Sequence, residues 1–227
     1  MNSETHNSIA NKRTYISQWY FNPVLLSMYD FFVYRFISRF IWGCPNKILI
    51  NRYKYYVDHN HLEVGVGTGY LLDSSNPINI NLDLLDLSKS CLYQSNKRLS
   101  RYQPALIRHN ILEKPLEEDK RYDSIGINYV MHCVAGDYKS KGIVFKNLKD
   151  LLKTKGVIFG SAVIKTEQST LPARFLMKFL NTFGVFSNSK DKIQDLDRAL
   201  KNHFKYVKLN IKSSVVLFVV SDNKNII

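Results

Sequence analysis

The sequence predicts an α/β fold in which a doubly wound sheet of about seven strands is mostly parallel and ends in an antiparallel hairpin. Three observations carry this prediction. From Leu62 onward, apolar runs alternate with amphipathic segments, as in parallel strands joined by helices. Three glycines at alternate positions between 65 and 69 follow the first run, where a buried strand would turn tightly into a helix. Near the C-terminus, residues 212–214 alone separate two further apolar runs, and so short a connection predicts a hairpin.

The bulk properties of the chain fit one globular domain. Its 227 residues are enough for a full core, and 45% of them are hydrophobic, which argues against disorder. The formal net charge is +13, but the Lys and Arg residues are scattered along the chain and form no long run. A generally basic surface that suits an anionic substrate is therefore favoured, and a nucleic-acid or membrane partner stays open.

Cysteine usage and the N-terminus bear on the compartment. The three cysteines, Cys44, Cys91 and Cys133, are odd in number and far apart, unlike a disulfide framework or a paired-cysteine zinc site. We therefore expect a reducing, cytoplasmic compartment and no metal centre. The polar N-terminus lacks the apolar core of a secretion signal, and no apolar stretch is long enough to predict a transmembrane helix.

The N-terminal quarter of the chain is expected to be helical. Residues 1–14 are predicted to be a flexible tail, and residues 15–57 a helical lid. Within the lid, an aromatic amphipathic helix is expected over residues 23–42 and a second helix over about residues 46–57, because Gly43, Cys44 and Pro45 interrupt the pattern between them.

The role of these helices has more than one interpretation. They either simply pack on the sheet or cover a substrate pocket, and one element can do both. In the second case the pocket would be lined by the aromatic residues Tyr29, Phe32 and Trp42. A membrane-surface helix is less favoured, because the polar face carries few cations.

The remaining elements follow from apolar runs and the breaks between them. The first strand is expected to end with residues 62–64. The later strands are expected over residues 78–85, 105–108, 122–129, 157–164, 206–211 and 215–220. Helices are expected over residues 69–74, 86–100, 139–153 and 171–183, with another ending near Phe204. In the helix over 139–153, which Lys155 and Gly156 should end, the inward side chains are Ile143, Leu148, Leu151 and Leu152. In the helix over 171–183, one face carries Phe175, Leu176, Phe179 and Leu180.

The stretch from Glu63 to Gly69 has the spacing E-x-G-x-G-x-G. Glycines allow a tight turn and a close ligand, and the amides at the start of the next helix attract polar groups. A dinucleotide-binding turn, G-x-G-x-x-G, needs a small third residue where Tyr70 stands. Asp86 lies about twenty residues after the first glycine, as acids that bind a ribose diol do, or else it caps the following helix.

This run resembles motif I of the class I S-adenosylmethionine-dependent methyltransferases, which have a Rossmann-like fold. Asp86, Asn110, the fourth-strand segment 123–128 and the fifth-strand entry 155–159 resemble later motifs of that family in the same order, over about residues 45 to 221. Asn110 replaces the commoner Asp, and residues 155–159 lack the usual Pro and one Gly. More narrowly, the segments 29–30, 42–45, 85–88 and 128–133 resemble a bacterial subgroup of small-molecule-type methyltransferases.

The resemblance implies S-adenosylmethionine as cofactor, bound by a domain over residues 58–227. It assigns the methionine portion to Glu63, the ribose to Asp86 and the adenine to Asn110 and Ile111. The full set of expected cofactor-binding residues is Glu63, Gly65, Gly67, Gly69, Asp86, Leu87, Asn110, Ile111 and Asn128. The alternatives are an exposed strand-end acid at 63, a turn without ligand at the glycines, a surface turn at 110–111, and a buried polar strand end at 128.

His132 is the candidate catalytic residue. It lies just after the fourth strand, where the transferred methyl should be exposed. The sulfonium already activates the methyl, so the protein has to align the nucleophile and remove its proton, which a histidine can accept near neutral pH. The alternative is a histidine that forms a local hydrogen bond or orients the cofactor. Cys133 beside it is expected to be a small buried side chain.

The acceptor is expected to be a small organic molecule, methylated on oxygen, nitrogen or carbon. Enzymes that methylate base amines usually carry Asn/Asp-Pro-Pro-aromatic after the fourth strand, and residues 128–131 contain no proline. No RNA-binding appendage is visible, and aromatic helices suit a covered apolar pocket. RNA methylation, an NAD(P)-dependent oxidoreductase and a non-enzymatic binding protein on the same fold are the alternatives.

Overall fold

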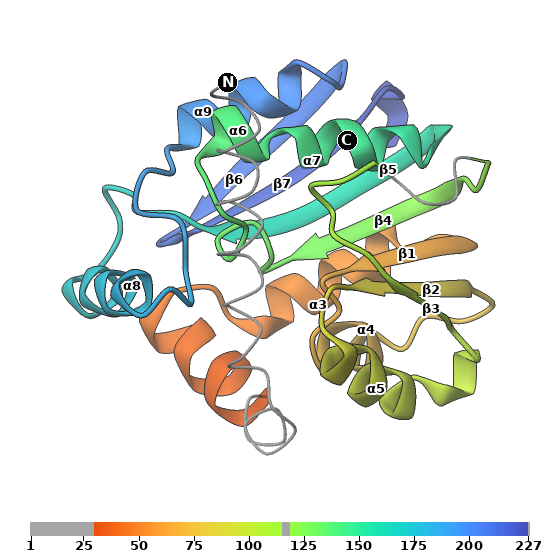
Figure 1. The fold of residues 1–227 in the computed structure, drawn as a ribbon, viewed down its shortest axis with the longest axis horizontal. Coiled ribbons are helices and arrows are strands. Elements are labelled where there is room, and N and C mark those ends of the chain that lie inside the picture. Colours follow the sequence, from red (N-terminus) through yellow and green to blue (C-terminus); the bar gives the residue numbers. More distant parts are fainter. Residues whose placement is uncertain (1–29, 115–118, 227) are drawn as a thin grey trace, which may run out of the picture.

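The computed structural model describes residues 30–114 and 119–226, which fold around a seven-stranded sheet (Figure 1). The strands lie in the order β3-β2-β1-β4-β5-β7-β6. The first five pair in parallel, and β7 is antiparallel to both β5 and β6. The predicted fold class is confirmed, including the C-terminal hairpin. The strands are β1 (Asn60–Val64), β2 (Asn81–Asp86), β3 (Ala105–Arg108), β4 (Tyr122–Asn128), β5 (Leu152–Val163), β6 (Tyr206–Lys212) and β7 (Val215–Ser221).

The order of the strands reverses beside β1. The chain runs outward from β1 to β2 and β3, and then crosses to β4 on the other side of β1. In such sheets, ligands bind outside the carboxyl ends of the strands at the reversal point. The glycine turn after β1, Asp86 at the end of β2 and Asn128 at the end of β4 lie at this edge. Helices η2 (Asp30–Ile41) and α8 (Leu171–Thr182) lie beyond it (Figure 1).

Helices cover both faces of the sheet and form two hydrophobic cores. The first core packs α6 (Tyr138–Lys141), α7 (Ile143–Asp150) and α9 (Ile193–Lys201) against one face (Figure 1). The second core packs α3 (Asn46–Tyr56), α4 (Tyr70–Ser75), α5 (Lys89–Arg98) and α8 against the other. Short turns of 3-10 helix complete the described part at Ser100–Tyr102 and Lys224–Ile226. None of the helices described is long and apolar enough to cross a membrane.

The position of a strand in the sheet decides whether all of its side chains are buried. Every residue of β7 is buried, because that strand lies between β5 and β6 and is covered on both faces. β6 is the edge strand, and all of its side chains are exposed or half-buried. Lys208 and Lys212 lie on it, and edge lysines discourage pairing with another chain.

The N-terminal helices follow the expected division. η2 is a π-helix that ends at Ile41, and α3 begins at Asn46. Gly43 between them has a φ of 69°, a left-handed conformation that glycine adopts without strain. The predicted tail, residues 1–14, lies outside the described residues, as do Tyr29 and the side chain of Phe32.

The single helix expected over residues 139–153 is wrong. Two helices, α6 and α7, meet at Gly142, whose added Cβ would lie 2.5 Å from the Tyr138 carbonyl oxygen and 3.1 Å from the Ala199 Cβ of α9. This close packing re-phases the helix, so Val144 and Phe145 are buried while Ile143 is 42% exposed. β5 already begins at Leu152, so the predicted stop at residues 155–156 is wrong as well.

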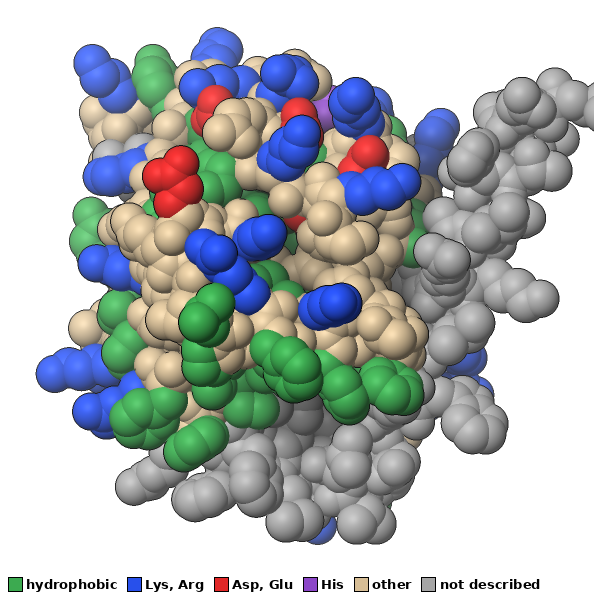
Figure 2. Space-filling model, turned by 90° about the vertical axis from the view of Figure 1, so that its left-hand side faces the viewer, with side chains coloured by type: hydrophobic (Ala, Val, Ile, Leu, Met, Phe, Trp, Pro, Cys, Tyr) green, Lys and Arg blue, Asp and Glu red, His purple; other side chains and the backbone are tan. Residues whose placement is uncertain are grey.

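The apolar face predicted for the helix over 171–183 is only partly buried in α8. Ala173 and Met177 are buried in the second core and Leu176 and Leu180 pack against it, whereas Phe175 and Phe179 are 72% and 49% exposed. Apolar residues surround most of this helix, so periodicity alone does not choose its buried face. Figure 2 shows hydrophobic side chains gathered on the side of the molecule where α8 lies in Figure 1, with Lys and Arg scattered over the same face.

The second strand begins later than predicted. β2 starts at Asn81, and Ile78, the expected first residue, is 79% exposed. Asn79 has a φ of 55°, a left-handed conformation that interrupts extended backbone. The strand therefore forms only beyond this turn.

Candidate active site

The turn between β1 and α4 is built by three left-handed glycines. Gly65, Gly67 and Gly69 have φ values of 63°, 54° and 74°. A Cβ on Gly65 would lie 2.3 Å from Val130 Cγ2, and one on Gly69 would lie 3.0 Å from Leu99 Cδ1, so packing within the chain already demands these two glycines. A Cβ on Gly67 would meet nothing within 4 Å. Gly67 is therefore the glycine of this turn whose backbone a ligand could approach without meeting another side chain.

Asp86 faces this turn from the end of β2. Its Oδ2 accepts a hydrogen bond from the Gly67 amide at 3.3 Å, and its Oδ1 accepts one from the Ser88 amide at 2.8 Å. Burial raises the pKa of Asp86 to about 6, and these amides oppose that rise. Ser88, and not Asp86, caps α5, because its hydroxyl accepts from the Cys91 amide. Leu87 between them is half-buried, and its carbonyl accepts from Arg108 Nε.

Glu63 of β1 is buried within a polar network that joins this strand to α3. It is 4% exposed, its Oε1 accepts from the Tyr53 hydroxyl at 2.5 Å, and its Oε2 lies 3.1 Å from His61 Nε2. Asn128 Nδ2 donates to the same Tyr53 hydroxyl at 3.1 Å. Asn128 is 6% exposed, and its Oδ1 is buried without a hydrogen-bond partner among the described residues. The predicted residues Glu63 and Asn128 are therefore joined through Tyr53, which sequence reasoning missed.

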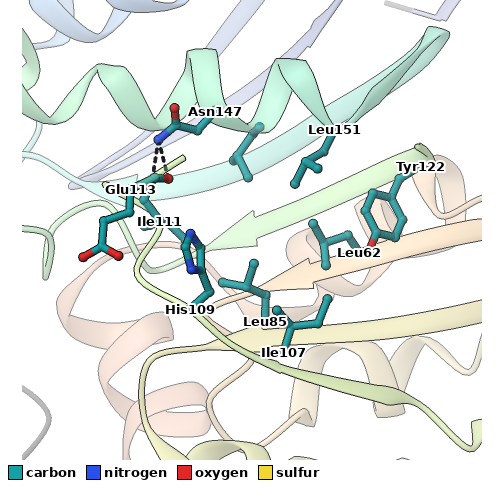
Figure 3. Close-up of a pocket in the computed structure, with 10 residues that line it drawn as sticks. Leu62, Leu85, Ile107, His109, Ile111, Glu113, Tyr122, Asn147 and Leu151 are labelled. Atoms are coloured by element: carbon teal, nitrogen blue, oxygen red, sulfur yellow. Dashed lines mark hydrogen bonds between the residues drawn. The ribbon is translucent and has the colours of Figure 1, made fainter. Parts of the chain in front are cut away.

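Asn110 and Ile111 form a turn after β3. The Asn110 side chain accepts from the Leu112 amide at 3.1 Å and donates to Glu113 Oε1 at 3.1 Å. Asn147 of α7 ties this turn to that helix by donating to the carbonyls of Ile111 and Glu113, as the dashed lines in Figure 3 show.

Beneath this turn lies a largely apolar cavity between the sheet and α7 (Figure 3). It is lined by Leu62, Leu85, Ile107, His109, Ile111, Glu113, Tyr122, Asn147, Leu148 and Leu151. His109 is 8% exposed, and its Nε2 is buried with no partner in the part of the chain that the structure describes. Ile111 is part of the turn at the carboxyl edge, and its side chain also packs against the first core.

His132 is held by the chain itself. It is 4% exposed, and its Nδ1 accepts from the Val163 amide at 3.2 Å. Burial, with a smaller effect from the positive charge of Lys141, lowers the pKa of His132 to about 3. The neutral ring then carries its proton on Nε2. The local hydrogen bond weighed as the alternative is present, and the catalytic role of His132 stays a prediction.

Aromatic rings connect His132 with the N-terminal helices. The Phe186 ring lies 4.3 Å from the His132 ring and 6.0 Å from the Trp42 ring, measured between centroids. Trp42 is 3% exposed. The Tyr129 ring stands 5.9 Å from His132, and its hydroxyl lies 2.8 Å from Ser38 Oγ of η2. This aromatic wall, Trp42, Phe186, His132 and Tyr129, joins three distant segments of the chain.

Tyr129 lies in the segment 128–133 that resembles the methyltransferase subgroup, but sequence reasoning assigned it no role, and Phe186 carries no sequence signal. Tyr129 has a φ of 57° directly after β4, a conformation that costs a non-glycine residue energy and tends to cluster at functional sites. Its amide donates to the Ser161 carbonyl at 2.9 Å, which fixes the turn. Phe186 lies in the connection between α8 and α9, and only its contacts mark it.

A buried ion pair fixes the segment next to His132. Lys141 Nζ lies 2.6 Å from Asp191 Oδ2, and both side chains are fully buried. The His132 carbonyl accepts from the Ser187 amide at 2.7 Å, so the same connection is anchored twice. Sequence reasoning missed this pair, because its members lie 50 residues apart.

The thiols and acidic groups show no metal or disulfide chemistry in the described ranges. Cys44, Cys91 and Cys133 are free, and burial raises the pKa of Cys133 to about 12. No three His, Cys, Asp or Glu side chains of residues 30–114 and 119–226 are arranged to hold a metal ion.

The glycine turn lies between polar side chains at the strand ends, at the point where the strand order of a doubly wound sheet reverses. This arrangement is typical of nucleotide-binding α/β proteins. A family model described as a methyltransferase domain matches residues 62–158. The methyltransferase aurB of Calcarisporium arbuscula is 36% identical over 218 residues, covering 88% of this chain and 94% of the relative. The demethylluteothin O-methyltransferase of Streptomyces thioluteus is 32% identical over 216 residues, covering 94% of each chain.

Solved structures share the fold at low identity. The DhpI–SAH complex has a TM-score of 0.66 at 10% identity and covers 92% of this chain and 98% of its own. The O-methyltransferase NcsB1 from neocarzinostatin biosynthesis has a TM-score of 0.62 at 12% identity, over 88% of this chain and 59% of its own. The chain belongs to the S-adenosylmethionine-dependent methyltransferases. The family resemblance is thereby confirmed, and the alternative of a nicotinamide-dependent oxidoreductase is excluded.

Proposed function

We propose that this methyltransferase transfers the methyl group of S-adenosylmethionine to a hydroxyl oxygen of a small, largely apolar organic molecule. The observation that carries the proposal is similarity over nearly the whole chain to relatives named for such chemistry. The demethylluteothin O-methyltransferase is one, and the physcion biosynthesis cluster O-methyltransferase of Aspergillus chevalieri is another, at 29% identity over 87% of this chain and 91% of the relative.

The residues at the carboxyl edge fit the cofactor. The bare backbone at Gly67 leaves room for it, and Asp86 offers carboxylate oxygens to its ribose diol beside that turn. Leu87, Asn110 and Ile111 would flank the adenine. Gly65 and Gly69 hold the turn in shape, while Glu63 and Asn128 would serve the methionine portion. The bound cofactor supplies a methyl already activated by its sulfonium, so the chain has to position and deprotonate the acceptor.

The acceptor would lie against the aromatic wall under a lid formed by residues 15–57, including Tyr29 and Phe32. Contact of Trp42 with Phe186, and of Phe186 with His132, supports this arrangement. His132 is the first residue to test as the proton acceptor. Its Nδ1 is engaged by the Val163 amide, so it can take a proton only after releasing that bond or exchanging its tautomer. The three free thiols favour a cytoplasmic, reducing location.

A binding assay and a turnover screen test the proposal. S-adenosylhomocysteine should raise the melting temperature of the protein, because a ligand that binds only the folded state stabilises it. A panel of phenols, enols, aromatic amines and tRNA is then incubated with the enzyme and S-adenosylmethionine, and each product is read by mass. Methyl gain on a hydroxylated small molecule is the expected result. Methylation of only amines or only RNA would refute the assignment of the acceptor.

A further inference from the structure

Three buried polar side chains form a continuous hydrogen-bonded chain between α3 and the sheet. Tyr53 comes from α3, Glu63 from β1 and Asn128 from the end of β4, and they are 1%, 4% and 6% exposed. The Tyr53 hydroxyl lies 2.5 Å from Glu63 Oε1 and 3.1 Å from Asn128 Nδ2. Tyr53 is therefore the link between two residues on neighbouring strands.

The direction of the hydrogen bonds in this chain is fixed by chemistry. A carboxylate can only accept, so the single Tyr53 proton is donated to Glu63. The Tyr53 oxygen is then left as an acceptor, and only the NH₂ end of the Asn128 amide can donate to it. This sets the rotamer of the amide and turns Oδ1 away from Tyr53. Within the described residues that buried oxygen has no donor.

The position of Asn128 indicates which donor is missing. β4 lies on one side of β1 and β2 on the other, so Asn128 and Asp86 flank the glycine turn from opposite sides. With the ribose bound at Asp86, an amino-acid portion that crossed the turn would come to the end of β4, where Asn128 lies. The ammonium of that portion is a cationic donor, and the negative charge of Glu63, relayed through Tyr53, favours a cation at Oδ1.

We propose that Tyr53 is a positioning residue that locks the Asn128 amide so that its Oδ1 accepts a hydrogen bond from the cofactor's ammonium group. This rests on the proposed function, since it assumes that S-adenosylmethionine binds at this turn. The sequence predicts a cofactor contact at Asn128, and the proposed role places that contact on its side-chain oxygen and gives α3 a part in cofactor recognition.

Two ligands that differ only in the amino-acid portion isolate this role. Equilibrium binding is measured by calorimetry with S-adenosylhomocysteine and with 5′-methylthioadenosine, which keeps the adenosine and sulfur but lacks the amino-acid portion, both its ammonium and its carboxylate. Tyr53→Phe should weaken binding of S-adenosylhomocysteine about tenfold, as expected for one hydrogen bond to a charged group. Binding of methylthioadenosine should change less than about twofold. Tyr55→Phe, on the same helix and 74% exposed, should change neither.

A second variant shows whether the effect travels through Asn128. Asn128→Ala should produce the same selective loss, and adding Tyr53→Phe to it should cost little more, because the two act through one contact. Equal weakening of both ligands by Tyr53→Phe, or additive losses in the double variant, would overturn the positioning role. If the wild-type protein binds neither ligand, the proposed function itself fails; if it binds S-adenosylhomocysteine and Tyr53→Phe has no effect, only the role of Tyr53 is refuted.

Discussion

The buried pair of Lys141 and Asp191 makes the strongest stability prediction. Lys141→Met keeps the apolar length of the side chain but leaves the Asp191 carboxylate buried without its cation. Asp191 Oδ1 already lacks a partner among the described residues, so little else compensates. Removing one member of a fully buried pair costs about 3–5 kcal/mol, whereas replacing both with apolar residues is often neutral. We expect a loss of that size in the free energy of unfolding, and recovery of most of it in Lys141→Met/Asp191→Leu.

Urea unfolding followed by circular dichroism measures both variants. The matched control is Lys146→Met, which breaks an exposed pair with Asp150 and should cost less than about 0.5 kcal/mol. Burial raises the pKa of Asp191 to about 6, and the Lys141 charge opposes that rise. A raised carboxyl pKa means stability that is present at low pH and lost as pH rises through that pKa, so the loss in Lys141→Met should be smaller at about pH 5 than at about pH 8. A single variant within about 1 kcal/mol of wild type, or a double variant as unstable as the single one, would contradict the reasoning.

The remaining predictions in this group concern Asp86, His132 and the glycine turn. Burial raises the pKa of Asp86 to about 6, and protonation of this carboxylate removes an acceptor for the ribose. Affinity for S-adenosylhomocysteine should therefore fall below about pH 6 in calorimetric titrations. The variant Asp86→Asn should bind weakly and without that pH dependence. His132→Gln should reduce turnover while leaving cofactor affinity nearly intact; lost affinity would reassign His132 to the cofactor site. Because burial lowers the pKa of His132 to about 3, the wild type should also lose stability as pH falls below about 6.5, and a pH series of unfolding curves should show a shallower loss in the variant. Gly67→Ala should weaken cofactor binding with only about 1 kcal/mol lost in stability, while Gly65→Ala, which collides with Val130, should cost more stability by thermal melting.

Local patterns were enough to predict the sheet. The glycines at 65 to 69 and the short hairpin connection act through the backbone of neighbouring residues, so both could be recognised directly. Prediction failed where a distant contact decided the outcome. The break at Gly142 depends on the approach of α9. The sequence also leaves open which part of the apolar surface of α8 is buried, because the core it packs against comes from other elements.

The same distinction separates the parts of the site. Asp86 lies beside Gly67 because β1 and β2 are parallel neighbours, which the order of motifs already implies. The hydrogen bonds from Tyr53 to Glu63 and Asn128 join three elements. The sequence pattern of α3 does not distinguish Tyr53 from an ordinary core residue. Local motifs therefore predict most of the cofactor-binding residues. They do not predict how the side chains of those residues are oriented.

The acceptor side has no local motif at all. Trp42, Phe186 and His132 come from the end of η2, the connection before α9 and the loop after β4, and they meet only in the folded chain. Two of these segments are held by contacts that carry no chemistry of their own: the Lys141–Asp191 pair, and the bond between the Ser187 amide and the His132 carbonyl. A change at any of these anchors should shift the aromatic wall without touching the cofactor turn. Selectivity for the acceptor should therefore change through substitutions far apart in the sequence, while affinity for S-adenosylhomocysteine stays constant, and a comparison of KM for acceptor and cofactor across such variants would separate the two.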